Sequence, residues 1–235
     1  MSEDQARADI CAVGRSLFER GYVHATAGNI SVRLPDGGFL MTPTDACLGR
    51  LVPDRLARIA PDGQQVSGDR ASKTLVLHRR IYAATADTAR PAGCVIHTHS
   101  THLVAASLAQ SGALAEQPEG AAAPDLLPPI TPYFVMKVGH VPHIAYRRPG
   151  APQAADAVEA AIAAHHAAEH PIAAVMLARL GPNVWHSHLF EAMALLEELE
   201  ETARLWLLGQ SLATPPDPLD PDQIAELRQQ FGAHW

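Results

Sequence analysis

Two histidines separated by a single residue, His97 and His99, are the side chains of this sequence best suited to chemistry. They follow the apolar residues 93–96, a run typical of a buried strand. Side chains two positions apart in a strand point to the same face, so both imidazoles can reach one ion. Neutral imidazole binds zinc, iron, nickel or copper well. The pair therefore predicts a metal site that takes its remaining ligands from elsewhere; the alternative is two structural histidines at a strand end.

Hydroxyl-rich turns form a second group of polar residues, spread over the segments 26–31, 42–45 and 68–73. Glycine lets a ligand approach backbone amides, while hydroxyls, an asparagine amide and a lysine at a helix start can donate hydrogen bonds to a phosphate. Each segment alone also has the composition of an ordinary turn or helix cap. Together they indicate an anion site, with purely structural turns as the alternative.

The spacing of apolar residues predicts the elements that position these side chains. Hairpins are expected at 29–42 and 58–66, and further strands at 93–99, 133–136, 141–144 and 172–178. Helices are expected at 3–20, 73–85, 101–110, 152–169, 189–208 and 220–231, with a loop at 111–129 that could cover a site. Hairpins with flanking helices favour a three-layer α/β/α sandwich whose central sheet is mostly antiparallel. At this length we expect a single domain over residues 1–235.

Composition excludes several classes of protein. A net charge of −7, scattered basic residues and only 5% aromatic residues argue against a nucleic-acid partner. The three cysteines lie far apart and suggest neither a disulfide framework nor a zinc knuckle. No run approaches the ~20 apolar residues of a membrane span. We therefore expect a soluble, cytoplasmic protein without a membrane partner.

The order of these segments resembles that of the class II aldolase and adducin-type family, over nearly the whole chain. The segments that carry the resemblance are 28–31, 42–44, Lys73 with His78, 97–102, 181–182 and 197–202. Within this family, residues 130–140 and 146–150 are most similar to the 3-oxo-tetronate 4-phosphate decarboxylases. Each motif is weak alone, but the shared order of all of them makes the resemblance strong.

The resemblance implies a carbon-carbon lyase, a decarboxylase or aldolase of carbohydrate metabolism that acts on a sugar acid phosphate. His97 and His99 would hold a divalent metal, zinc first, with manganese, cobalt, nickel or iron as alternatives, and this metal would stabilise an enediolate. The phosphate would lie near Asn29, Thr44, Ser72 and Lys73. Lys73 and Tyr133 would be catalytic, Tyr133 as a proton donor. A packed aromatic is the alternative role of Tyr133. Relatives are commonly tetramers, so a homotetramer is expected.

Two positions depart from the family pattern. The family places a glutamate four residues before the helix histidine, where this chain has Thr74, and a metal histidine before Gly-Pro, where it has Leu180. Neither side chain can replace the expected group as a base or a metal ligand.

These departures leave three alternatives. Nearby histidines could substitute as ligands, namely His102, His186 and His188. The chemistry could have shifted, for example to a hydroxy-aromatic acid. Lastly, the chain could be catalytically silent and bind a ligand or a partner.

Overall fold

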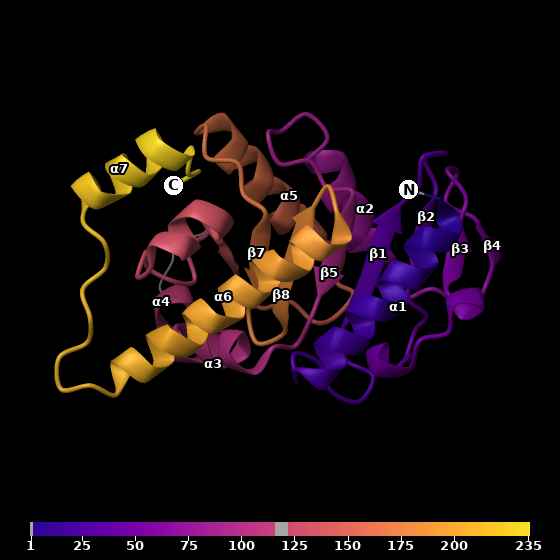
Figure 1. Cartoon of the computed structure of the whole chain (residues 1–235), viewed down its shortest axis with the longest axis horizontal. Helices are drawn as coiled ribbons and strands as arrows, with labels where there is room; N and C mark the ends of the chain where they lie inside the picture. Colours follow the sequence, from indigo (N-terminus) through magenta and orange to yellow (C-terminus); the bar gives the residue numbers. More distant parts are fainter. Residues whose placement is uncertain (1, 116–121) are drawn as a thin grey trace.

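An eight-stranded sheet runs through the computed structural model of the chain, which describes residues 2–115 and 122–235 (Figure 1). The strand order is β4-β3-β2-β1-β5-β8-β7-β6, and among the strands of the described residues only the pair β6 and β7 is parallel. The strands are β1 (Asn29–Arg33), β2 (Phe39–Met41), β3 (Ala57–Ile59), β4 (Gln65–Ser67), β5 (Cys94–His97), β6 (His143–Ile144), β7 (Ala174–Leu177) and β8 (Gly181–His186). The predicted, mostly antiparallel sheet is confirmed.

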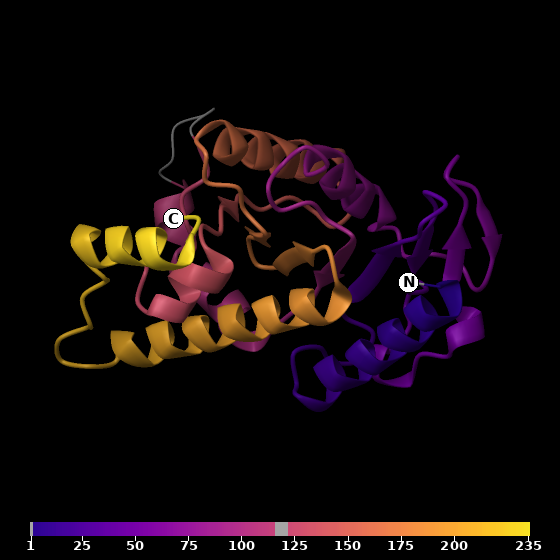
Figure 2. The ribbon, with the colours of Figure 1, turned by 45° about the horizontal axis from the view of Figure 1, so that its top comes forward.

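Helices cover both faces of this sheet, which confirms the predicted three-layer architecture. Figure 2 shows α2 and α5 on one side, and α1 and α6 on the other. The α-helices are α1 (Glu3–Glu19), α2 (Leu75–Ala84), α3 (Thr101–Ala109), α4 (Ser111–Ala115), α5 (Pro152–Ala167), α6 (Leu189–Gln210) and α7 (Pro221–Phe231). The described residues also form two 3-10 turns, η1 (Leu48–Arg50) and η2 (Pro53–Arg55), and one π-helix, η3 (Phe134–Val138). No helix in the described ranges is long and apolar enough to span a membrane.

Alternation along the strands divides the apolar residues between two cores. Ile30, Ile96 and Val184 pack with the apolar faces of α1 and α6. Val95 and Trp185 point the other way and pack with α2 and α5. Because alternate side chains of a strand share a face, Asn29, His97 and Asn183 must lie on the α2/α5 face of the sheet. The fold thus places polar side chains from three adjacent strands in one row.

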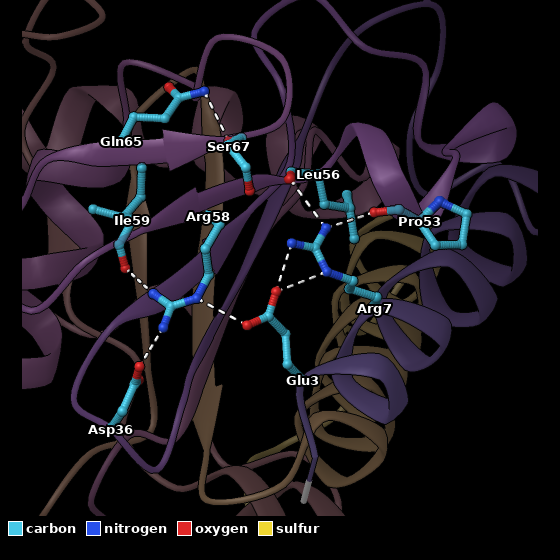
Figure 3. A network of polar contacts seen from close by, with 9 residues as sticks. All are labelled: Glu3, Arg7, Asp36, Pro53, Leu56, Arg58, Ile59, Gln65 and Ser67. Carbon is cyan, nitrogen blue, oxygen red and sulfur yellow. Dashed lines mark hydrogen bonds and ion pairs between the residues drawn. The ribbon is translucent and has the colours of Figure 1, made fainter.

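A polar network fixes α1 to the edge of the sheet (Figure 3). The Glu3 carboxylate accepts hydrogen bonds from Arg7 Nη2 at 2.6 Å and from Arg58 Nε at 3.0 Å. Arg7 also donates to the carbonyl oxygen of Pro53 at 2.7 Å, and Arg58 contacts Asp36. Burial opposes ionisation of Glu3, but its bonds with the two arginines outweigh that effect and lower its pKa. The network therefore joins α1, β3 and η2 by charge-assisted hydrogen bonds.

Three sequence predictions need correction. The strand expected at 133–136 is the π-helix η3, in which the Phe134 N–H bonds the Thr131 hydroxyl, because a short apolar run does not distinguish a strand from a helix. The loop expected from residue 111 begins with α4, and residues 116–121 lie outside the described ranges. Strand β8 was not predicted, since Gly181 and Pro182 at its start are typical of a turn.

Glu200 differs from the other glutamates of the acidic run 197–201, which the sequence suggests is a solvent-exposed helix face. Its side chain is buried, and its carboxylate accepts hydrogen bonds from the backbone N–H groups of His102 and Leu103 at 3.0 and 3.1 Å. It also bonds His102 Nδ1 at 2.8 Å. Glu200 of α6 thus caps the N-terminus of α3, directly after the histidine pair.

Candidate functional site

The histidine pair lies where β5 ends. His97 is the last residue of the strand and is buried, whereas His99 is half-buried and lies two residues beyond the strand, so the predicted strand is too long. Their ring centroids are nevertheless 5.1 Å apart. Two imidazoles on one tetrahedral ion, with metal–nitrogen distances of about 2.0–2.1 Å, have centroids about 5 Å apart. The spacing of the two rings therefore fits a shared ion.

Both imidazoles have the protonation state that a ligand needs. His97 Nδ1 donates a hydrogen bond to the carbonyl oxygen of Pro182 at 2.8 Å, which leaves the lone pair on Nε2. Burial, and secondarily the nearby His99, lowers the pKa of His97 to about 4. Burial and the neighbouring His24 lower the pKa of His99. His97 is thus neutral at pH 7 and presents a free ring nitrogen.

A cavity of about 390 Å³ opens beside His97 on the α2/α5 face of the sheet. It lies between the start of α2, the segment before α5 and the turn that joins β7 to β8. Its lining residues are Lys73, Thr74, Val76, Leu77, His97, Ala145, Arg147, Arg148, Pro149, Gly150, Ala151, Pro152, Ala154, Ala155, Leu177, Ala178, Leu180 and Asn183. The volume suits a small molecule of a few carbons.

The charge of this cavity is positive. Lys73, Arg147 and Arg148 line it, and no aspartate or glutamate is among the described residues of its lining. None of these cations forms an ion pair within the described part of the chain. Sequence reasoning did not select the two arginines, although they follow one another in a Pro-Gly-containing loop. Such a lining favours an anionic ligand.

The four residues expected near a phosphate are only partly brought together. Lys73 lines the cavity beside His97, and Asn29 is the register partner of His97 across β1 and β5. Asn29 is buried, and its Oδ1 has no partner among the described residues. Ser72 lies beside Lys73, where its hydroxyl contacts that of Thr74 at 2.9 Å. Thr44 instead lines a separate cavity of about 380 Å³.

Tyr133 does not reach the cavity. It precedes the π-helix η3, the residue is 61% exposed, and it is absent from the described lining. A tyrosine in this position can act only on a group that approaches from outside the chain.

The two departures from the family pattern both lie at the cavity. Thr74 precedes α2 and Leu180 lies in the turn between β7 and β8, and both line the space beside His97. Gly181 has φ +147°, and a Cβ there would lie 1.9 Å from the carbonyl oxygen of Thr98. Only glycine, which has no Cβ, allows the turn that contains Leu180 to approach the histidine segment this closely.

The substitute histidines are not at this position. His186 is the register partner of Cys94, at the other end of β5 from His97, and His188 lies beyond it. His102 is held by Glu200. The ring centroid of another histidine, His24, lies 6.4 Å from that of His99.

The donor set therefore fits only part of a metal site. Within residues 2–115 and 122–235, no group of three or more His, Cys, Asp and Glu side chains is arranged to hold an ion. His97 and His99 supply two neutral donors, and the unpartnered amide oxygens of Asn29 and Asn183 lie in the same row. Any ion held here would need further ligands from water or substrate.

Comparison with known proteins gives one consistent result. The family model described as Class II Aldolase and Adducin N-terminal domain matches residues 8–207. A 3-oxo-tetronate 4-phosphate decarboxylase from Cupriavidus necator is 49% identical over 240 residues, which cover 100% of this chain and 99% of the relative. A protein of the same name from Escherichia coli K12 is 39% identical and covers 96% of each chain.

Solved structures agree with the sequence relatives. YgbL from Escherichia coli, described as a candidate aldolase, epimerase or decarboxylase, superposes with a TM-score of 0.80 at 36% identity, over 97% of this chain and 100% of the other. An L-fuculose-1-phosphate aldolase from Thermus thermophilus gives a TM-score of 0.67 at 28% identity, over 87% and 95% of the two chains.

Proposed function

Because the chain belongs to the class II aldolase and adducin family, we propose that it is a lyase that decarboxylates 3-oxo-tetronate 4-phosphate. The observation that carries this proposal is the cationic cavity beside His97, which suits a ligand with a carboxylate and a phosphate. Full-length similarity at 49% identity to a decarboxylase of that name supports the choice of substrate.

The reaction needs an electron sink at the ketone. When the bond between C1 and C2 breaks, carbon dioxide leaves and its electron pair moves onto the C3 oxygen, which gives an enediolate. A proton delivered to C2 then yields dihydroxyacetone phosphate. Groups that stabilise negative charge on the C3 oxygen lower the barrier, because that charge develops only during the reaction.

Several side chains are suited to binding the substrate's anionic groups. Ser72 and Lys73 lie immediately before the N-terminus of α2, where the helix dipole and an ammonium group both favour a phosphate. Arg147 and Arg148 border the same cavity and suit the carboxylate. We assign Asn29 to the phosphate side, and Thr44 to a more remote contact.

A divalent metal is typical of this family and suits the histidine pair. We propose that His97 and His99 hold it, with zinc as the first expectation and manganese, cobalt, nickel or iron as alternatives. When bound, the metal would supply a positive charge beside the substrate oxygens. His97 has its ring orientation fixed by the carbonyl of Pro182, a contact that keeps Nε2 available.

We also propose a homotetramer, in which Tyr133 would serve as proton donor to a neighbouring subunit. Its exposure, and its absence from the described lining of the cavity in its own chain, support this arrangement. The last turns of α6 and the segment after it expose Leu205, Leu208 and Leu212, a surface suited to a subunit contact. Light scattering at micromolar concentration should give about four times the chain mass of 25.1 kDa. A monomer would leave Tyr133 without a role.

The proposed activity is tested by carbon dioxide release above the spontaneous background. We expect a kcat/KM for 3-oxo-tetronate 4-phosphate at least about 100-fold above that for unphosphorylated 3-oxo-tetronate. The unphosphorylated acid has no phosphate for Lys73 and the N-terminus of α2 to bind. Release only from hydroxy-aromatic acids would support a re-tuned site around Thr74 and Leu180. No release from any substrate would favour a silent, ligand-binding family member.

A further inference from the structure

Asn183 is a buried amide without a partner in the sheet. It lies in β8, opposite His97 of β5, and its side chain lines the cavity. The residue is 1% exposed, yet neither Oδ1 nor Nδ2 has a hydrogen-bond partner among the described residues. Buried polar groups of native proteins are nearly always paired, because an unpaired amide loses its hydration without compensation. The amide is therefore expected to bond something that enters the cavity.

The sheet itself does not require an asparagine at this position. Its register neighbour on the β7 side, Val175, is apolar, and Trp185 two residues along β8 is fully buried; only the neighbour on the β5 side, His97, is polar. Leucine has the same branching as asparagine, and valine is a β-branched residue that favours strands. Either side chain would continue that apolar surface. An unpartnered asparagine costs stability at this buried position, and its place beside the cavity therefore indicates that it binds a ligand.

We propose that Asn183 binds the hydroxyketone part of the substrate, an inference that rests on the proposed function. A carboxamide presents a donor and an acceptor side by side. The C3 oxygen of 3-oxo-tetronate 4-phosphate is an acceptor, and the adjacent C2 hydroxyl is a donor. Nδ2–H would therefore donate to the C3 oxygen, while Oδ1 accepts from the C2 hydroxyl. The first of these bonds strengthens as the C3 oxygen gains negative charge.

The cationic side chains of the cavity are suited to the two anionic groups of the substrate, so the neutral hydroxyketone between them is left for the Asn183 amide. Lys73, Arg147 and Arg148 supply the positive charges that a phosphate and a carboxylate require. Asn183 is neutral and lies beside His97, the histidine proposed to face the reacting oxygens. It also lies close in sequence to Leu180, where the family's histidine is missing. Asn183 would thus restore a polar contact to a site that has lost one.

The test compares Asn183→Leu and Asn183→Val with Trp185→Phe in the full-length protein. Trp185 is a matched control because its Nε1 is also buried and unpartnered, on the same strand and face, but it does not line the cavity. The probes are dihydroxyacetone phosphate, which has the hydroxyketone group, and inorganic phosphate, which lacks it. Calorimetry gives both affinities, and thermal unfolding gives the Tm without ligand.

We expect both Asn183 variants to bind dihydroxyacetone phosphate at least about 10-fold more weakly, which corresponds to about 1.4 kcal/mol. Inorganic phosphate should bind within about 2-fold of wild type, and the Tm of Asn183→Leu should equal or exceed that of wild type, since no unpaired amide is buried. Trp185→Phe should bind both probes as wild type does.

Two results would overturn the inference, and they distinguish its failure alone from failure of the proposed function as well. If wild type and Asn183→Leu bind dihydroxyacetone phosphate equally while the Tm of the variant falls, the amide bonds structural water and not substrate. If wild type binds neither dihydroxyacetone phosphate nor inorganic phosphate, the proposed function fails as well. A variant that folds poorly is replaced by the other, because leucine and valine make the same polar deletion.

Discussion

His97→Ala is expected to lower kcat/KM for decarboxylation of 3-oxo-tetronate 4-phosphate at least about 100-fold, a loss typical of removing one group that stabilises developing charge. His97 is buried, is neutral at pH 7 and has its Nδ1 fixed by Pro182, so the substitution removes a free ring nitrogen held in one position. Steady-state carbon dioxide release measures the effect.

A matched control for this change is His166→Ala, because His166 is an exposed histidine near the end of α5. It should retain activity within about 2-fold of wild type, as surface substitutions usually have small effects. Activity of His97→Ala within about 3-fold of wild type would remove the histidine pair from the mechanism.

Restoring the two missing family residues is expected to raise the affinity for a divalent metal by on the order of 100-fold. Thr74 and Leu180 both line the cavity with His97, so glutamate and histidine at these positions would enter the same space. Glutamate would also add a negative charge to a cavity whose described lining includes three positive side chains and no carboxylate. Titration of Thr74→Glu with Leu180→His against zinc, by calorimetry, measures the gain without any turnover.

Size is controlled by Thr74→Gln with Leu180→Phe, which adds bulk at both positions without a carboxylate or an imidazole. Zinc affinity of this variant should stay close to that of wild type. If the restored variant binds zinc no better than this control, the two positions do not face the ion. If turnover falls while affinity rises, the natural site is adapted to a looser metal.

The family and much of the fold could be predicted from the sequence because local signals agreed with tertiary structure. Ser2 caps α1 by accepting a hydrogen bond from the Gln5 N–H at 3.2 Å, and serine directly before an apolar helical pattern is a common start signal for a helix. The turn chemistry at 35–38 joins β1 to β2, and alternation along β1 separates its two faces. The predicted pair His97 and His99 also lies together, although the strand ends earlier than expected.

The remaining parts of the site depend on contacts between distant segments. Asn183 was missed because β8 begins with Gly-Pro, and only the pairing with β5 shows that its amide lies beside His97. The position of Arg147 and Arg148 at the cavity follows from the packing of the segment before α5, which no local pattern specifies. His186 looked available by sequence distance, but the register of β5 and β8 puts it at the other end of the strand.

The most direct test of the proposed function follows both products of one reaction by NMR. Substrate labelled with carbon-13 at C1 is incubated in D₂O with the wild-type protein, and the spontaneous rate is subtracted. We predict that labelled carbon dioxide and dihydroxyacetone phosphate appear at equal rates, with one deuteron on the carbon that lost the carboxyl group. Label that leaves C1 no faster with the folded protein than without it would contradict a decarboxylase at the His97 cavity.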